Sequence, residues 1–357
     1  MRRWRLGLLA AAGAVALATA IVPSLQPGAG AVEAAFTVPR SIVVETRPIT
    51  ALRPSDPMRR RFGDLEFLGG LVLTSRDRAF GGLSGLRTLD HGRDLLAIGD
   101  EGSWFVARLT EDASGRPTGV ESALAAPLLD EQGRPFRGKV NRDAESVTIR
   151  RHGAGLEARV GFEHRHRILA YRSDAGLGGL LSAPGRAIPV PSDIRALPPN
   201  SGLEALADVP DAHALVAVAE DPEPGAAANP AWILSGSDWK RFRIHVTDGY
   251  SITDAAVLPS GDLLLLERRL TMFGQFAARI ARVAADDLGT GRTIEPAVLY
   301  ESETGDEIDN MEGLAVDTAD DGSTLVTLVS DDNFFFLQRT LLLRFRLDVD
   351  REKGRAN

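Results

Sequence analysis

Three glutamates, Glu145, Glu204 and Glu312, occupy the same position in a short motif that recurs along the chain. In each copy the glutamate stands at the start of a short apolar run of the kind that forms a β-strand. Carboxylates that a fold brings together repel one another, which raises their pKa values unless a cation compensates. Calcium prefers oxygen ligands and tolerates irregular geometry. We therefore interpret the three glutamates as candidate calcium ligands. The alternative is that each accepts hydrogen bonds from the backbone of the next repeat.

A second apolar run follows most copies of the motif and ends in acidic residues. The clearest example ends in Asp331, Asp332 and Asn333. These side chains are further candidate calcium ligands, although Asp and Asn are also frequent in turns for conformational reasons. Arg142 and Arg268 lie in loops, and guanidinium groups opposite a calcium site would bind the oxygens of a substrate by paired hydrogen bonds. The alternative for each arginine is an exposed surface position.

The motif recurs at a spacing of about 57 residues. Its central positions are Ser84, Glu145, Glu204, Asp254 and Glu312. Short apolar runs bounded by Gly, Pro, Asp and Asn predict antiparallel strands throughout. A repeat of this kind is typical of a β-propeller, in which matching positions lie at matching heights around a channel. Dividing residues 32–357 by the spacing predicts an all-β, six-bladed β-propeller. A two-sheet sandwich is the alternative.

The N-terminal residues 1–31 have the pattern of an export signal. Arg2, Arg3 and Arg5 precede an apolar run, and residues 29–31 form a small-x-small cleavage site. An uncleaved membrane anchor is the alternative, and the Arg2-Arg3 pair leaves open either the Sec or the twin-arginine route. We expect a periplasmic or secreted mature protein. Residues 32–64 form an N-terminal segment with a candidate closing strand near 41–46, residues 65–347 the propeller, and residues 348–357 a polar tail.

Composition removes several classes of function. The net charge of −8 argues against nucleic-acid binding, which needs clustered Lys and Arg. The chain has no cysteine, which excludes disulfides, thiolate zinc sites and a cysteine nucleophile. The serine in Gly82-Leu83-Ser84-Gly85 lacks the spacing of a nucleophile elbow. We expect a monomer without a stable membrane span after signal cleavage, acting on a small molecule.

The repeated motifs resemble those of the phytase-like family, also called esterase-like activity of phytase. The resemblance spans roughly residues 65–347, and its most specific parts are Asn310-Met311-Glu312-Gly313-Leu314 and Ser330-Asp331-Asp332-Asn333-Phe334. Further matching segments begin at Gly81, Asn141 and Gly202. The resemblance implies a propeller outside the cytoplasm that hydrolyses ester or phosphoester bonds. Similarity to calcium-dependent propeller phytases would imply a calcium-activated water, but this chain has no dense basic cluster for phytate itself.

From these patterns we predict an exported calcium-dependent hydrolase of phosphate or carboxylic esters. Glu145, Glu204 and Glu312 would hold calcium with the acidic turn at 331–333, and no catalytic residue is assigned. One alternative is a non-catalytic propeller that binds a partner in the cell envelope. Another is a calcium-dependent lactonase.

Overall fold

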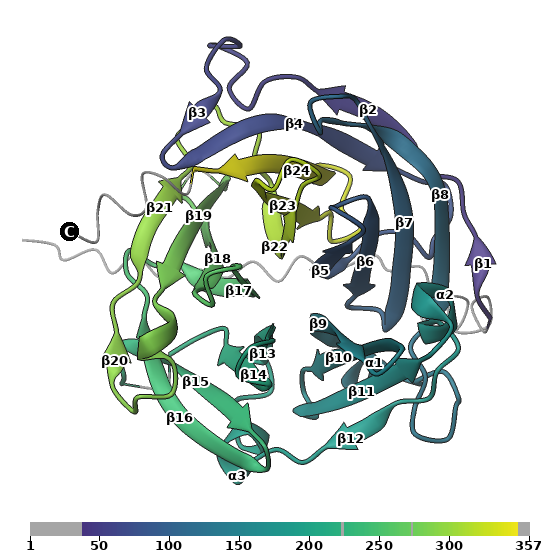
Figure 1. The fold of residues 1–357 in the computed structure, drawn as a ribbon, viewed down its shortest axis with the longest axis vertical. Helices are drawn as coiled ribbons and strands as arrows, with labels where there is room; N and C mark the ends of the chain where they lie inside the picture. The colour runs from purple at the N-terminus through teal and green to yellow at the C-terminus, as the bar shows by residue number, and fades with distance from the viewer. Residues whose placement is uncertain (1–37, 223–224, 273, 349–357) are drawn as a thin grey trace, which may run out of the picture. The chain divides into compact units, whose positions relative to one another are not determined.

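The computed structural model describes residues 38–222, 225–272 and 274–348. The predicted signal peptide, and the polar tail from residue 349 onward, lie outside these residues. The described residues form five sheets arranged in a ring, with one strand of each sheet lining the centre (Figure 1). Their strands pair antiparallel, except that β20 pairs parallel with β16. The innermost strands β5, β9, β13, β17 and β22 contact one another in that order around the ring, and β22 contacts β5. The all-β propeller prediction is therefore confirmed.

The five sheets are the blades of the propeller, and the strands of each follow one another from the centre of the ring outward. Blade 1 contains β5 (Leu83–Leu89), β6 (Asp94–Gly99), β7 (Ser103–Glu111), β8 (Pro117–Pro127) and β1 (Arg40–Ser41). Blade 2 contains β9 (Ala144–His152), β10 (Gly155–Phe162), β11 (Arg167–Ser173) and β12 (Arg186–Ile188). Blade 3 contains β13 (Leu203–Val209), β14 (Ala214–Ala219), β15 (Ala228–Ser235), β16 (Asp238–His245) and β20 (Thr293–Ile294).

Blades 4 and 5 complete the ring. Blade 4 contains β17 (Ser251–Val257), β18 (Leu263–Leu270), β19 (Phe276–Val283) and β21 (Ala297–Glu301). Blade 5 contains β22 (Asn310–Thr318), β23 (Thr324–Asp331), β24 (Thr340–Leu347), β4 (Leu65–Thr74) and β2 (Glu45–Ile49), and β3 (Arg61–Phe62) also pairs with β4. The described helices are short: α1 (Lys139–Arg142), α2 (Gly176–Leu180), α3 (Ser192–Arg195) and a 3₁₀ turn at Ala285–Asp287. No described helix is long and apolar enough to cross a membrane.

The prediction of six blades is wrong, because the residues before β5 do not form a blade of their own. Strands β2 and β4 join blade 5, and β1 joins the outer edge of blade 1. The five copies of the motif each mark one blade, whereas chain length divided by the repeat counts these N-terminal strands as an extra blade. Blade 5 therefore contains strands from both ends of the described chain, with Leu73 of β4 opposite Thr340 of β24.

The second strands of blades 3 and 5 are buried on both faces. Every residue of β14 (Ala214–Ala219) and of β23 (Thr324–Asp331) is buried. A blade is packed between two neighbours, so both faces of its middle strands are removed from water. The resulting cores lie between sheets; one of them packs Leu264 and Leu266 of blade 4 against Leu314 and Leu343 of blade 5.

An arginine fills the centre of the ring. Arg87 of β5 is 6% exposed, and its guanidinium group pairs with both carboxylate oxygens of the fully buried Asp254 at 2.8 and 3.1 Å. It also donates to the carbonyls of Leu206, Ala255 and Leu314. One side chain thus ties β5 to the inner strands of blades 3, 4 and 5.

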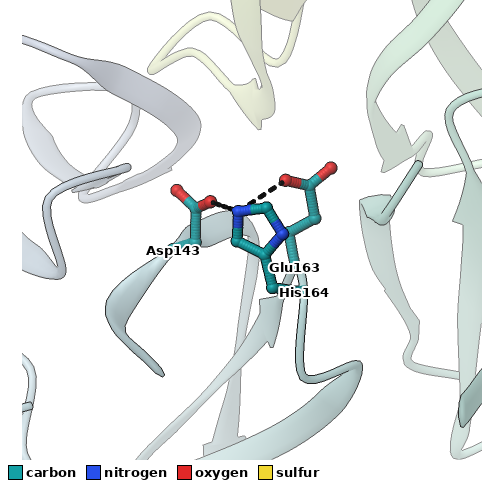
Figure 2. A group of neighbouring side chains, drawn as sticks. All are labelled: Asp143, Glu163 and His164. Carbon is teal, nitrogen blue, oxygen red and sulfur yellow. Dashed lines mark ion pairs between the residues drawn. The ribbon is translucent and has the colours of Figure 1, made fainter. Parts of the chain in front are cut away.

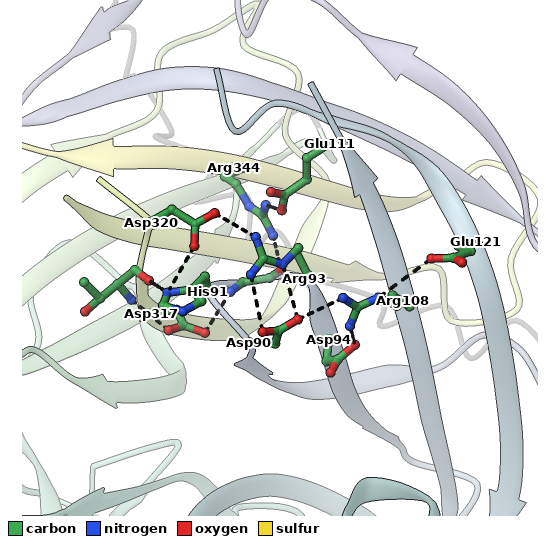
Figure 3. Close-up of polar contacts among 12 residues, drawn as sticks. Asp90, His91, Arg93, Asp94, Arg108, Glu111, Glu121, Asp317, Asp320 and Arg344 are labelled. Atoms are coloured by element: carbon green, nitrogen blue, oxygen red, sulfur yellow. Dashed lines mark hydrogen bonds and ion pairs between the residues drawn. The ribbon is translucent and has the colours of Figure 1, made fainter. Parts of the chain in front are cut away.

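A second ionic network lies where β5 ends, between blades 1 and 5 (Figure 3). Arg93 pairs with Asp320 at 2.8 Å and with Asp90 at 3.3 Å, and these groups are partly or largely exposed. Next to them, and fully buried, Arg344 pairs with Glu111 and donates to the carbonyl of Gly92. Arg87 is buried and Arg93 is partly exposed, so replacing each in turn compares a buried with an exposed ion pair.

Candidate functional site

All five inner strands contain a β-bulge at the same position. In β13, Leu203 pairs with Ala219 and Ala205 with Val218, which leaves Glu204 without a direct partner across the sheet. The same register shift occurs in each of the other four blades. The bulged residues are Ser84, Glu145, Glu204, Thr253 and Glu312. A bulge re-aims a side chain at the end of a sheet, so the sequence repeat corresponds to a repeated local geometry.

The alignment was wrong by one residue in blade 4. Thr253 occupies the bulge, where its hydroxyl donates to the carbonyl of Met311. Asp254 is the next residue, pairs directly with Leu266 across the sheet, and binds Arg87 in the centre of the ring. Asp254 is therefore not a fourth member of the glutamate set.

The three predicted glutamates meet at one end of the ring. The pKa of the buried Glu204 is raised by burial and then by the nearby carboxylates of Glu145, Glu220, Glu312 and Glu163. Burial also raises the pKa of Glu312 to about 7, although the nearby Arg268 opposes the shift. Three glutamates from blades 2, 3 and 5 thus share one electrostatic environment, as the repeat predicted.

The acidic turn after β23 contributes one residue to this group. Burial, and then the carboxylate of Asp100, raises the pKa of Asp331 to about 8. Asp332 is half-buried and accepts hydrogen bonds from the backbone of Gly82 and Phe334. Asn333 is exposed, and its backbone N–H donates to Asp331 at 2.7 Å. The structure therefore brings Asp331 to the glutamates, whereas Asp332 and Asn333 shape the turn.

Four further carboxylates complete the set, and they were not assigned to the site from the sequence. Three of them, Asp100, Glu163 and Glu220, follow directly after the second strands of blades 1, 2 and 3. Because these strands run antiparallel to the inner ones, their ends lie where the inner strands begin. Burial raises the pKa of Asp100 to about 6 and the pKa values of Glu163 and Glu220 to about 7. The acidic ends of the second apolar runs were the available signal.

The fourth carboxylate, Asp143, forms a compact group with Glu163 and His164 (Figure 2). His164 Nε2 lies 3.0 Å from Asp143 Oδ2 and 3.8 Å from Glu163 Oε2. Asp143 is 1% exposed, and no hydrogen-bond donor of the described residues reaches its other oxygen, Oδ1. A cation does lie near that oxygen: Lys139 Nζ is 3.4 Å away, and it is also 3.3 Å from Asp100 Oδ2.

The two predicted substrate arginines have different surroundings. Arg268 lies between Glu220 and Glu312, with nitrogen–oxygen distances of 3.2 Å to each, and donates to Asn310 at 2.7 Å. Arg142 instead pairs with Glu101 at the edge of the cluster. Of these two arginines, only Arg268 pairs with the glutamates that meet at the end of the ring.

We call the eight carboxylates the mouth cluster: Asp100, Asp143, Glu145, Glu163, Glu204, Glu220, Glu312 and Asp331. Among the lysines and arginines that the structure describes, Lys139 and Arg268 pair directly with it. Burial raises the pKa values of Glu163, Glu220 and Glu312 to about 7 and that of Asp331 to about 8, so these four carboxylates take up protons near neutral pH when no other cation is present. Carboxylate oxygens are the donors that calcium prefers, and Asp143 Oδ1 offers a buried oxygen that accepts no hydrogen bond from the described residues. Asp143, Glu163 and His164 each offer a ligand atom within 4.8 Å of the others, so this part of the mouth cluster fits a calcium ion.

Comparison with known proteins agrees with the motifs. The family model described as Phytase-like, esterase-like activity of phytase, matches residues 78–334. No curated protein matches the chain in sequence. Among solved structures, the chain is similar to a thermostable family-43 glycoside hydrolase, with 12% identity, a TM-score of 0.44 and coverage of 74% of this chain and 89% of that one. It is also similar to the α-L-arabinofuranosidase PaAbf62A from Podospora anserina, with 10% identity, a TM-score of 0.45 and coverage of 80% and 97%.

Proposed function

Because the chain belongs to the phytase-like family, whose description is esterase-like activity of phytase, we propose that it is a hydrolase of ester bonds. In the more specific form of the proposal, it is exported, depends on calcium, and acts on phosphate or carboxylic esters. The basic and apolar N-terminal segment of the sequence supports export. The observation that carries the calcium dependence is the mouth cluster, in which buried carboxylates from four blades share one environment.

Residues of the mouth cluster have distinct roles in this proposal. Asp143, whose Oδ1 accepts no hydrogen bond from the described residues, would hold the ion together with Glu145, Glu204, Glu312 and Asp331. A bound calcium ion would act as a Lewis acid, which would polarise the substrate and lower the pKa of a bound water. Glu163 is a candidate general base, because its carboxylate lies beside Asp143 and 3.8 Å from His164 Nε2.

Arg268 and Lys139 supply the positive charge that developing negative charge on a substrate oxygen requires. In the absence of substrate, each is paired with carboxylates of the cluster. A substrate oxygen would therefore share Arg268 with Glu220 and Glu312 rather than meet a free guanidinium group. This arrangement orients a substrate oxygen toward the cluster.

The test is hydrolysis of p-nitrophenyl phosphate, p-nitrophenyl acetate, p-nitrophenyl butyrate and a simple lactone, with and without a chelator. We expect turnover of at least one substrate, its loss on chelation, and its return when calcium is added. Glu204→Gln and Glu312→Gln should each lower the calcium affinity by at least about tenfold, since each removes a charged ligand. Glu295→Gln is the matched control, because Glu295 is 71% exposed and pairs with His245 on the outer strands.

The outcomes separate the alternatives. Turnover of the lactone alone would identify a lactonase. Calcium binding that raises Tm without turnover of any substrate would favour the non-catalytic binding propeller. Failure of calcium to bind, measured by isothermal titration calorimetry on chelator-treated protein, would refute the metal-dependent mechanism.

A further inference from the structure

A phenylalanine is held in a strained position beside the mouth cluster. We propose that Phe334 is the surface on which the apolar part of the substrate packs, so that the preferred substrate is a carboxylic ester with an aryl or alkyl group rather than a polyanionic phosphate. This inference rests on the proposed function and names its substrate class. Four features carry it: the backbone of the Phe334 turn, the glycines beneath the ring, the exposure of the ring and the charge around it.

The turn places two consecutive non-glycine residues in the left-handed region. Asn333 has φ of 47° and Phe334 has φ of 50°. A bulky residue in this region is uncommon and costs about 1–2 kcal/mol. The conformation is held by Asp331 and Asp332, whose carboxylates accept from the backbone N–H groups of Asn333 and Phe334 at 2.7 and 3.2 Å. Strain of this kind persists where the surrounding structure enforces it, and it is concentrated at functional sites.

Two glycines make room for the ring. A Cβ atom on Gly81 would lie 2.7 Å from Phe334 Cε1, and one on Gly82 would lie 2.9 Å from Phe334 Cε2 and collide with Asp100 Oδ1. Gly82 therefore lies between the ring and a carboxylate of the mouth cluster. The phenyl ring and the Asp100 carboxylate therefore both lie against the backbone of Gly82. A ligand that reached the cluster at Asp100 would meet the ring.

The ring and the residues after it are turned toward solvent. Phe334 is 54% exposed, and Phe335, Phe336 and Leu337 are also exposed, at 49%, 86% and 68%. Four consecutive exposed apolar side chains form a patch of the kind that marks a binding site, whereas scattered ones need no explanation. Only Asn333 separates the patch from Asp331 and Asp332, so the apolar patch and these carboxylates belong to one turn.

The charge around the ring selects against polyanions. The mouth cluster has eight carboxylates, and Lys139 and Arg268, which pair with it, are already engaged. One bound calcium ion would leave little positive charge for a substrate with several phosphate groups, since like charges disfavour one another. An uncharged ester can pack its apolar group on the Phe334 ring, and it carries no negative charge for the mouth cluster to repel.

The test separates the ring from the turn that holds it. Asn tolerates the left-handed region, so Phe334→Asn should leave Tm unchanged or higher while removing the ring. Phe334→Ala is the second variant, and Val298→Ala, at 45% exposure on β21, is the matched control. The ligand is p-nitroacetanilide, an amide analogue that is not expected to be turned over, and its binding to calcium-loaded protein is measured by titration calorimetry. We expect the two Phe334 variants to bind it at least tenfold more weakly than wild type, a loss of about 1.4 kcal/mol, and Val298→Ala to bind it normally.

Binding that is equal in wild type and Phe334→Asn would overturn the inference, as would the absence of binding to wild type. Tighter binding of inositol hexakisphosphate than of the amide would overturn the substrate class. A parallel assay compares KM for p-nitrophenyl butyrate with KM for p-nitrophenyl phosphate, and Phe334→Asn should raise only the first. Absence of hydrolysis on every ester would refute the proposed function, while the binding measurement would still decide the role of Phe334.

Discussion

Replacing Arg87 with Met tests whether the central arginine holds the blades together. The substitution keeps an unbranched apolar chain of similar length and removes the guanidinium group. It leaves the carboxylate of Asp254 buried without its ion-pair partner. It also removes the donor to the carbonyls of Leu206, Ala255 and Leu314.

Breaking a buried ion pair by removing one partner destabilises a protein by about 3–5 kcal/mol. Loss of the hydrogen bonds to the three carbonyls increases this destabilisation. Protonation of Asp254 decreases it, because burial already raises the pKa of that carboxyl. We expect a loss of about 4 kcal/mol in the free energy of unfolding. For a domain of this size that corresponds to a fall in Tm of roughly 8 °C.

The assay is thermal and denaturant unfolding of chelator-treated protein, so that metal binding does not contribute. Arg93→Met is the matched control, because Arg93 pairs with Asp90 and Asp320 in the more exposed network (Figure 3) and should lose less than about 1 kcal/mol. The double variant Arg87→Met/Asp254→Leu should recover part of the loss, since no unpaired charge remains. Equal stability of Arg87→Met and Arg93→Met would refute the idea that the central pair holds the ring together.

Two further predictions concern the mouth cluster and the backbone. In calcium-free protein, Asp331 and Glu312 have raised pKa values of about 8 and 7, so the folded state binds more protons than the unfolded state above about pH 4. Tm should therefore fall between about pH 5 and pH 8, and saturating calcium should remove the fall; a flat profile without calcium would contradict the shifts. Gly63→Ala should cost more than about 2 kcal/mol in denaturant unfolding, because its φ is 60° and the new Cβ would collide with the Leu299 carbonyl. Gly115→Ala, with φ of 78° and open space around it, should cost only about 1 kcal/mol, and equal losses would show that the collision is relieved.

The repeat could be read from the sequence because the constraint is local and recurs. Glu145, Glu204 and Glu312 each lie within the first three residues of an inner strand, and each falls on the bulge that turns its side chain toward the same end of the ring. In blade 4 the apolar pattern fits either Thr253 or Asp254, and only the hydrogen-bond register distinguishes them. The burial of Asp254 against Arg87 depends on a contact between blades 1 and 4, which the sequence pattern of neither blade contains.

Blade number and ion pairing needed the structure for a similar reason. The N-terminal strands add length without adding a motif, so the five motifs indicated the correct count and the chain length did not. Arg142 and Arg268 look alike in sequence. In the fold, Arg142 pairs with Glu101 outside the mouth cluster, whereas Arg268 pairs with two carboxylates of the cluster. Long-range pairing of this kind leaves no periodic signal.

The pairing of β4 with β24 sets the order in which the molecule can be completed. Strand β4 is among the first to be synthesised, but its partner is the last described strand of the chain. Until β24 emerges, β4 has an unpaired apolar edge that can associate with other chains. Ring closure is then the contact with the longest loop, which makes it the slow step of folding. Aggregation of newly made protein should therefore increase with the time between the synthesis of β4 and its pairing with β24.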